Sequence, residues 1–64
     1  MIKEYDKVKL KTGEIARISE VLEDKVAYIA DIFTKDGHIS IEQIGYADIF
    51  SVFEEVEHTL AQTM

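Results

Sequence analysis

The sequence predicts an all-β domain, a small five-stranded barrel, and three observations lead to this expectation. Apolar and polar residues alternate in the first segment, glycine-containing turns separate the apolar segments, and five short strands fit into about fifty residues. Closing such strands into a barrel removes the unpaired edges that a flat sheet would leave. No proline, linker or repeat divides the chain. We therefore expect one domain over residues 1–64, with the barrel at about residues 5–55.

The first predicted hairpin begins with a strand at Lys7–Lys11. Val8 and Leu10 alternate with lysines, which gives this strand one apolar face. Thr12 and Gly13 supply the turn that follows, because glycine adopts a positive φ without a steric penalty.

The next segment, Glu14–Leu22, fits either a helix or a strand. Some of its apolar residues recur at helical spacing, but a helix here would be shorter than about three turns and would leave the first strand without a neighbour. Its β-branched residues and the preceding turn favour a strand. We predict a strand at Ala16–Leu22, with a bulge near Ser19 that lets Ile18 and Val21 both face inward.

Three further strands complete the predicted barrel. The first of these, Val26–Phe33, carries apolar residues on both faces, which predicts a central strand covered on both sides. An Asp-Gly pair at positions 36–37 predicts a hairpin turn after it. Gly45–Asp48 predicts a tight turn, or a single 3₁₀ turn, before the last strand. These strands are expected at Val26–Phe33, His38–Ile44 and Ile49–Phe53.

The C-terminal residues 56–64 have two interpretations. Val56 and Leu60 are four residues apart, which is the spacing of a short helix. Without a partner surface such a helix would be marginal. A short helix and a disordered tail therefore both remain open for this segment.

Two short motifs carry a resemblance to a known family. Asp6–Gly13 reads D-K-V-K-L-K-T-G, and Asp48 and Ile49 stand at the start of the last predicted strand. Over about Tyr5–Glu55, this pattern resembles the small bacterial proteins with a Src-homology-3-like barrel. Many of those proteins are uncharacterised, so the resemblance implies a fold and no activity. The chain lacks the Trp and clustered Tyr-x-Tyr of eukaryotic peptide-binding members, which argues against proline-rich ligands.

The charge of the chain argues against general nucleic-acid binding. Seven basic and thirteen acidic residues give a net charge of −6, and the acidic C-terminal two thirds would repel a phosphate backbone. An alternative function is a nucleic-acid accessory protein that uses the N-terminal basic face formed by Lys7, Lys9, Lys11 and Arg17. The simpler interpretation is that these lysines solvate an exposed strand face and discourage edge pairing.

The sequence offers no catalytic, metal or cofactor site. It has no cysteine, its serines lack the nucleophile-elbow context, and its glycines are too isolated for a phosphate-binding loop. His38 and His58 lack a second ligand at helical spacing. Glu54, Glu55 and Glu57 beside His58 are expected to form a solvated acidic run rather than a metal site. We expect no enzymatic activity and no cofactor.

The aromatic residues are the best candidates for a contact surface. Seven aliphatic residues are expected to fill the interior: Val8, Leu10, Ile18, Val21, Ile29, Ile41 and Ile49. Some large rings must then lie outside, either capping the barrel ends or forming a contact patch. The candidate interface residues are Tyr28, Phe33, Tyr46, Phe50 and Phe53.

These observations favour a small non-catalytic binding or assembly module, which acts through a protein partner or through self-association. A core of this size without disulfide or metal is marginal, so a homodimer is favoured over a monomer. The sequence shows no membrane-spanning run and no signal segment. We expect a cytoplasmic protein without a membrane partner.

Overall fold

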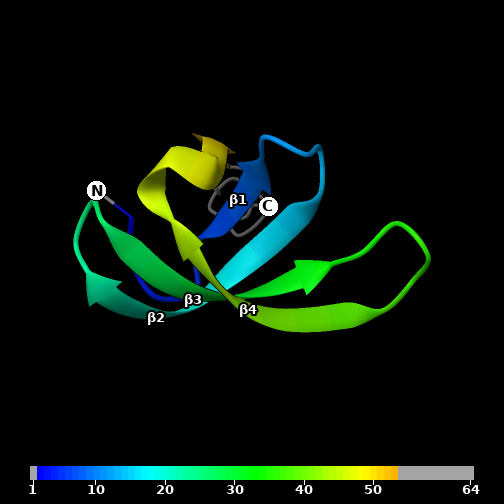
Figure 1. Ribbon diagram of the computed structural model, residues 1–64, viewed down its shortest axis with the longest axis horizontal. Coiled ribbons are helices and arrows are strands. Elements are labelled where there is room, and N and C mark those ends of the chain that lie inside the picture. The colour runs from blue at the N-terminus through cyan, green and yellow to red at the C-terminus, as the bar shows by residue number, and fades with distance from the viewer. Residues whose placement is uncertain (1, 54–64) are drawn as a thin grey trace, which may run out of the picture.

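The computed structural model describes residues 2–53, which form one antiparallel sheet of five strands (Figure 1). The sheet order is β4-β3-β2-β1-β5, so β4 and β5 are its two edges. The all-β prediction is confirmed, and the described residues contain no α-helix. The sheet is not closed into the expected barrel, because β4 and β5 do not pair with each other. The C-terminal segment with its two interpretations lies outside them. The elements are β1 (Lys7–Leu10), β2 (Ile15–Glu23), β3 (Ala27–Phe33), β4 (Ile39–Gly45), the 3₁₀ helix η1 (Tyr46–Asp48) and β5 (Ile49–Val52).

The segment that fitted both a helix and a strand is β2, which pairs with β1 on one side and with β3 on the other. Its register with β3 shifts between Ile18 and Glu20, which places a bulge at Ser19. The hydroxyl of Ser19 donates a hydrogen bond to the carbonyl of Ile29 at 3.1 Å. The extra residue allows Ile18 to be buried while Val21 packs against the core. The predicted bulge is therefore confirmed.

The predicted turns are present. Gly13 and Gly37 have φ values of +97° and +91°, in the left-handed region that favours glycine. The predicted turn after β4 is η1. Its Asp48 carboxylate accepts a hydrogen bond from the N–H of Gly45 at 2.8 Å, which holds the chain as it passes from β4 to β5.

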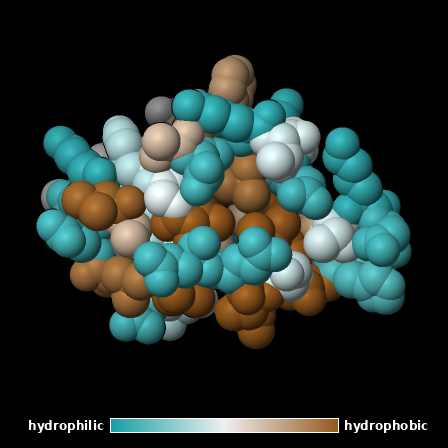
Figure 2. All heavy atoms as spheres, in the orientation of Figure 1, coloured by the Kyte–Doolittle hydropathy of each residue, from teal (hydrophilic) through white to brown (hydrophobic). Residues whose placement is uncertain are grey.

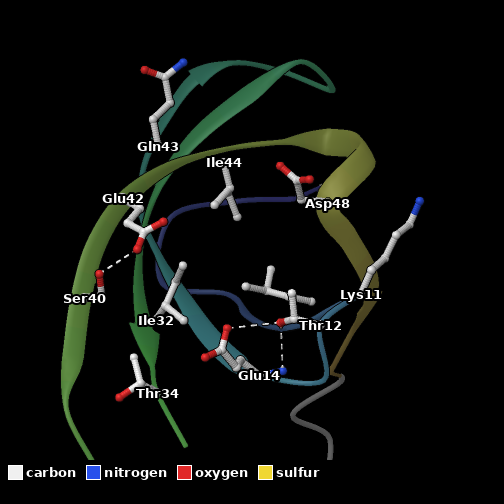
Figure 3. A pocket seen from close by; sticks show the side chains of 11 residues that line it. Lys11, Thr12, Glu14, Ile32, Thr34, Ser40, Glu42, Gln43, Ile44 and Asp48 are labelled. Atoms are coloured by element: carbon white, nitrogen blue, oxygen red, sulfur yellow. Dashed lines mark hydrogen bonds between the residues drawn. The ribbon is translucent and has the colours of Figure 1, made fainter.

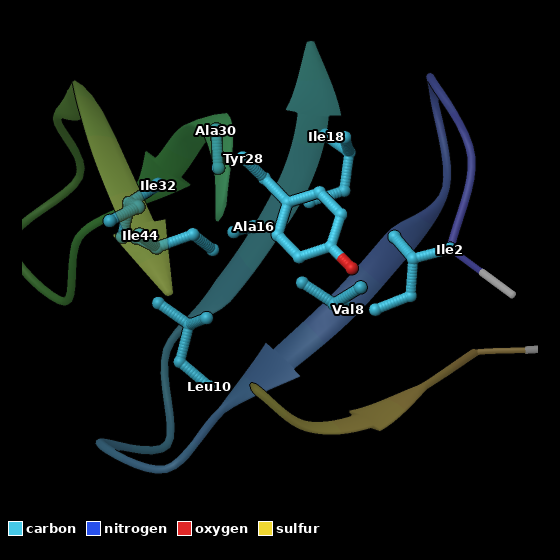
Figure 4. Close-up of a cluster of buried hydrophobic side chains, with 9 residues drawn as sticks. All are labelled: Ile2, Val8, Leu10, Ala16, Ile18, Tyr28, Ala30, Ile32 and Ile44. Carbon is cyan, nitrogen blue, oxygen red and sulfur yellow. The ribbon is translucent and has the colours of Figure 1, made fainter. Parts of the chain in front are cut away.

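The core lies on the inner face of the curved sheet, around Tyr28 (Figure 4). Tyr28 was predicted as an interface residue, but its side chain is fully buried, and this prediction is wrong. Ala16 and Ala30 occupy inner positions of β2 and β3, and these small side chains leave room for the ring. The Tyr28 hydroxyl accepts a hydrogen bond from the N–H of Lys25 at 3.0 Å. The core consists of Ile2, Val8, Leu10, Ala16, Ile18, Tyr28, Ala30, Ile32 and Ile44.

The buried isoleucine of β4 is not the one that the sequence predicted. Ile41 was expected in the interior, but it is 72% exposed, whereas Ile44 on the same strand is 7% exposed. The register explains this, because Ile41 lies opposite Asp31 and Ile39 lies opposite Phe33. These residues share the outer face of the sheet, which nothing covers in the described part of the chain. The expectation that β3 is covered on both faces is therefore also wrong.

Candidate functional site

The outer face of the β3–β4 hairpin carries exposed apolar side chains. Phe33 is 40% exposed and Ile39 is 61% exposed, and these two residues lie directly opposite each other. Together with Ile41 they form what we call the outer-face patch. Figure 2 shows hydrophobic residues along the lower margin of the molecule, where Figure 1 places this hairpin. A contiguous apolar group on the surface of a soluble domain is typical of a contact surface.

The patch lies at one edge of the sheet. Its residues Ile39 and Ile41 belong to β4, which has β3 as its single neighbour in the sheet order. Glu42 is the one charged residue of β4, which contains neither lysine nor proline. An apolar outer face therefore adjoins a strand edge that few charges protect.

The concave side of the sheet contains a cavity of about 330 Å³, between β4 and the turn that joins β1 to β2 (Figure 3). Three carboxylates on its rim each accept a hydrogen bond from a close neighbour. The Thr12 hydroxyl donates to Glu14 at 3.1 Å, and the Ser40 hydroxyl donates to Glu42 at 2.7 Å. The third is Asp48, bonded to the N–H of Gly45 as described above. The floor consists of the core residues Leu10, Ile32 and Ile44.

These carboxylates do not form a metal site. Within residues 2–53, no group of three or more histidine, cysteine, aspartate or glutamate side chains has the arrangement that could hold a metal ion. His38 lies in the exposed β3–β4 turn, with its Nε2 3.9 Å from the Oδ2 of Asp36. The acidic run at positions 54–57 and His58 lie outside the described residues.

The structure separates the predicted aromatic interface residues. Tyr28 lies in the core, and Phe33 belongs to the outer-face patch. Tyr46 and Phe50 are exposed and line a second hollow of about 240 Å³ beside β5. Phe53 is exposed just after β5, where its N–H donates a hydrogen bond to the Lys7 carbonyl at 2.9 Å. The aromatic residues therefore do not form a single patch.

The structure brings together part of the predicted basic face. Lys7 and Lys9 lie on the outer side of β1, and Arg17 of β2 lies opposite Lys7. The Nζ of Lys7 is 5.3 Å from the centroid of the Phe53 ring, a cation–π contact. Lys11 follows the end of β1 and lines the cavity on the concave side instead. The prediction that the three lysines share one strand face is wrong, because β1 ends before Lys11.

Sequence reasoning missed the two isoleucines that make up most of the outer-face patch. Ile39 and Ile41 alternate with Ser40 and Glu42, a pattern that shows one face is apolar without showing which face is buried. The signal that could have identified the inner face is Ile44, which breaks this alternation and lies on the opposite side of the strand.

No helix in the described part of the chain is long and apolar enough to cross a lipid bilayer. Comparison of the chain with protein-family models, with curated proteins and with solved structures found no match.

Proposed function

We propose that this chain is a small non-catalytic binding module that acts through self-association. The observation that carries this proposal is the outer-face patch, in which Phe33, Ile39 and Ile41 are exposed side by side. Single exposed apolar residues are normal on protein surfaces, but a contiguous group of them favours a contact surface.

The size of the core also supports self-association. A domain of 64 residues without cysteine has no disulfide to reinforce it. Burial of about 400 Å² of apolar surface on each subunit contributes on the order of 10 kcal/mol per subunit, against association costs of about 4–15 kcal/mol. Association with a second copy of the chain would therefore bury apolar surface in addition to that buried in the small core.

We further infer that the fold is a Src-homology-3-like barrel that stays open between its edge strands β4 and β5. The strand order β4-β3-β2-β1-β5, the single 3₁₀ turn before the last strand and the curvature of the sheet around its core support this assignment. Domains of this kind have small, filled interiors. We infer that binding takes place at the outer-face patch and not in the cavity on the concave side.

The chain is expected to be a dimer at high micromolar concentration. Size-exclusion chromatography coupled to light scattering across a concentration series measures its mass, and thermal melts at the same concentrations provide a second test. A dimer melts at a higher temperature when it is concentrated, because mass action favours the associated native state. A monomer mass at high micromolar concentration, with a melting temperature independent of concentration, would contradict self-association.

The second candidate function is that of a nucleic-acid accessory protein, which the shared outer face of Lys7, Lys9 and Arg17 favours. Against it stand the net charge of −6 and the position of Lys11 on the concave side. We expect no measurable binding of mixed-sequence DNA or RNA at physiological salt, as measured by fluorescence anisotropy. Micromolar binding that weakens steeply with salt, and is lost when Lys7, Lys9 and Lys11 are all changed to alanine, would favour the second function instead.

A further inference from the structure

We propose that two copies of the chain pair through the free edges of their β4 strands, antiparallel, around a two-fold axis at Ile41. This inference rests on the self-association proposed above and specifies its interface. The pairing would join the two sheets into one continuous sheet, with main-chain hydrogen bonds across the boundary.

The hydrogen bonds between β3 and β4 show which backbone groups face the free edge. At the turn, the N–H of Thr34 donates to the carbonyl of His38 at 2.8 Å, and at the other end the N–H of Tyr46 donates to the carbonyl of Val26 at 3.0 Å. Hydrogen-bonded and non-hydrogen-bonded pairs alternate in an antiparallel ladder, and the register between these two ends has no shift.

It follows that the even-numbered residues of β4 bond to β3, and the odd-numbered residues direct their N–H and C=O groups to the free edge. No strand of residues 2–53 lies beyond this edge. The same odd-numbered residues place their side chains on the outer face. The free backbone groups and the exposed isoleucines therefore belong to one row of residues, Ile39, Ile41 and Gln43.

Strand β4 lacks the features that usually prevent edge pairing. Edge strands are commonly protected by lysine, proline, a bulge or short length. β4 has seven residues with neither lysine nor proline, and its pairing with β3 is regular. The other edge, β5, has four residues, and its register with β1 is irregular. β4 is therefore the edge better suited to pairing.

A second copy of β4 is complementary to this edge. With Ile41 of the two copies opposite each other, each Ile39 lies opposite the other copy's Gln43, and each Ser40 lies opposite the other copy's Glu42. The isoleucines at the axis bring the two outer-face patches together into one apolar surface. On the inner face, each Glu42 carboxylate meets a hydroxyl group, the same kind of donor that it already uses within its own chain.

Charge favours this register over the neighbouring register centred on Glu42. An axis at Glu42 would place two carboxylates on directly opposite residues, with Cβ atoms about 4.5–5.5 Å apart, and like charges in this position are destabilising. An axis at Ile41 separates the two Glu42 side chains and places a serine opposite each.

Amide hydrogen exchange, followed residue by residue by NMR across a concentration series, tests which groups the interface uses. The even-numbered amides from 40 to 44 are expected to be protected at all concentrations, because they bond to β3. The odd-numbered amides from 39 to 43 are expected to gain protection as the dimer forms. A dimer in which these odd-numbered amides stay unprotected would overturn edge pairing and leave self-association intact.

Single-cysteine variants test the register, because the chain has no cysteine of its own. Ile41→Cys is expected to oxidise to a covalent dimer, since the Cα atoms of a hydrogen-bonded antiparallel pair lie about 5.5 Å apart, within disulfide range. Gln43→Cys is expected to cross-link with Ile39→Cys but not with itself. The matched control is Phe50→Cys on β5, which is 69% exposed against 72% for Ile41 and is expected to remain uncrosslinked. Self-crosslinking of Gln43→Cys instead of Ile41→Cys would overturn the register.

A pair of lysine variants separates this inference from the proposed function. Ile41→Lys places two like charges at the axis and is expected to weaken dimerisation by about tenfold or more. Phe50→Lys is expected to leave dimerisation unchanged, with circular dichroism verifying that both variants fold. Loss of the dimer in Phe50→Lys but not in Ile41→Lys would overturn the β4 interface while self-association stands. A wild-type chain that stays monomeric would overturn both.

Discussion

Replacement of Tyr28 by alanine is expected to remove most of the stability of this domain. The Tyr28 side chain is fully buried at the centre of the core, and truncation of a buried aromatic residue costs about 3–5 kcal/mol. At about 0.05–0.15 kcal/mol per residue, a chain of 64 residues has a total stability of about 3–10 kcal/mol. Urea unfolding followed by far-ultraviolet circular dichroism measures the loss.

The conservative variant Tyr28→Phe separates the ring from its hydroxyl. Phenylalanine keeps the apolar ring but leaves the N–H of Lys25 without the acceptor that it has at 3.0 Å. Loss of this hydrogen bond is expected to cost about 0.5–1.5 kcal/mol, well below the cost of Tyr28→Ala. Near wild-type stability for Tyr28→Ala would contradict a buried ring and would indicate that Tyr28 lies on the surface.

Two isoleucines of β4 are expected to respond very differently to truncation. Ile44→Ala is expected to cost about 2–5 kcal/mol, because Ile44 lies in the core and its truncation leaves a cavity. Ile41→Ala is expected to cost less than about 0.5 kcal/mol in the monomer, because the Ile41 side chain lies on the surface. Urea unfolding at low micromolar concentration, where the proposed dimer is expected to dissociate, compares the two variants.

The two variants share one residue type and one strand, so they differ mainly in the face of the sheet that they occupy. A stability loss for Ile41→Ala that equals or exceeds the loss for Ile44→Ala would contradict an exposed Ile41. In that case the outer-face patch and the β4 interface would both be abandoned.

Local chemistry made the turns and the bulge predictable from the sequence. Gly13 and Gly37 are positions where positive φ is needed, and glycine accepts this conformation more readily than other residues. The bulge at Ser19 followed from the need to turn Ile18 and Val21 to the same side, because residues three apart on a regular strand lie on opposite faces. These features depend on neighbouring residues and not on distant strands.

Which face of β4 is buried could not be predicted in the same way. A change of one residue in register moves every side chain of a strand to the other face, and the pairing of Ile41 with Asp31 fixes that register across a hairpin turn. Tyr28 was misplaced for a related reason, because the space for its ring comes from Ala16 on a neighbouring strand. Contacts between strands decide both positions, and a single-strand pattern does not contain them.

In the proposed dimer, the alternation along β4 separates folding from recognition within seven consecutive residues. Positions with even numbers anchor the strand to the domain, and those with odd numbers face outward in both side chain and backbone. If the proposed β4 pairing holds, mutations at Ile39, Ile41 and Gln43 are expected to change the choice of partner without loss of the fold. Opposite charges introduced at position 41 of two separate copies offer a direct route from a symmetric pair to an obligate heterodimer.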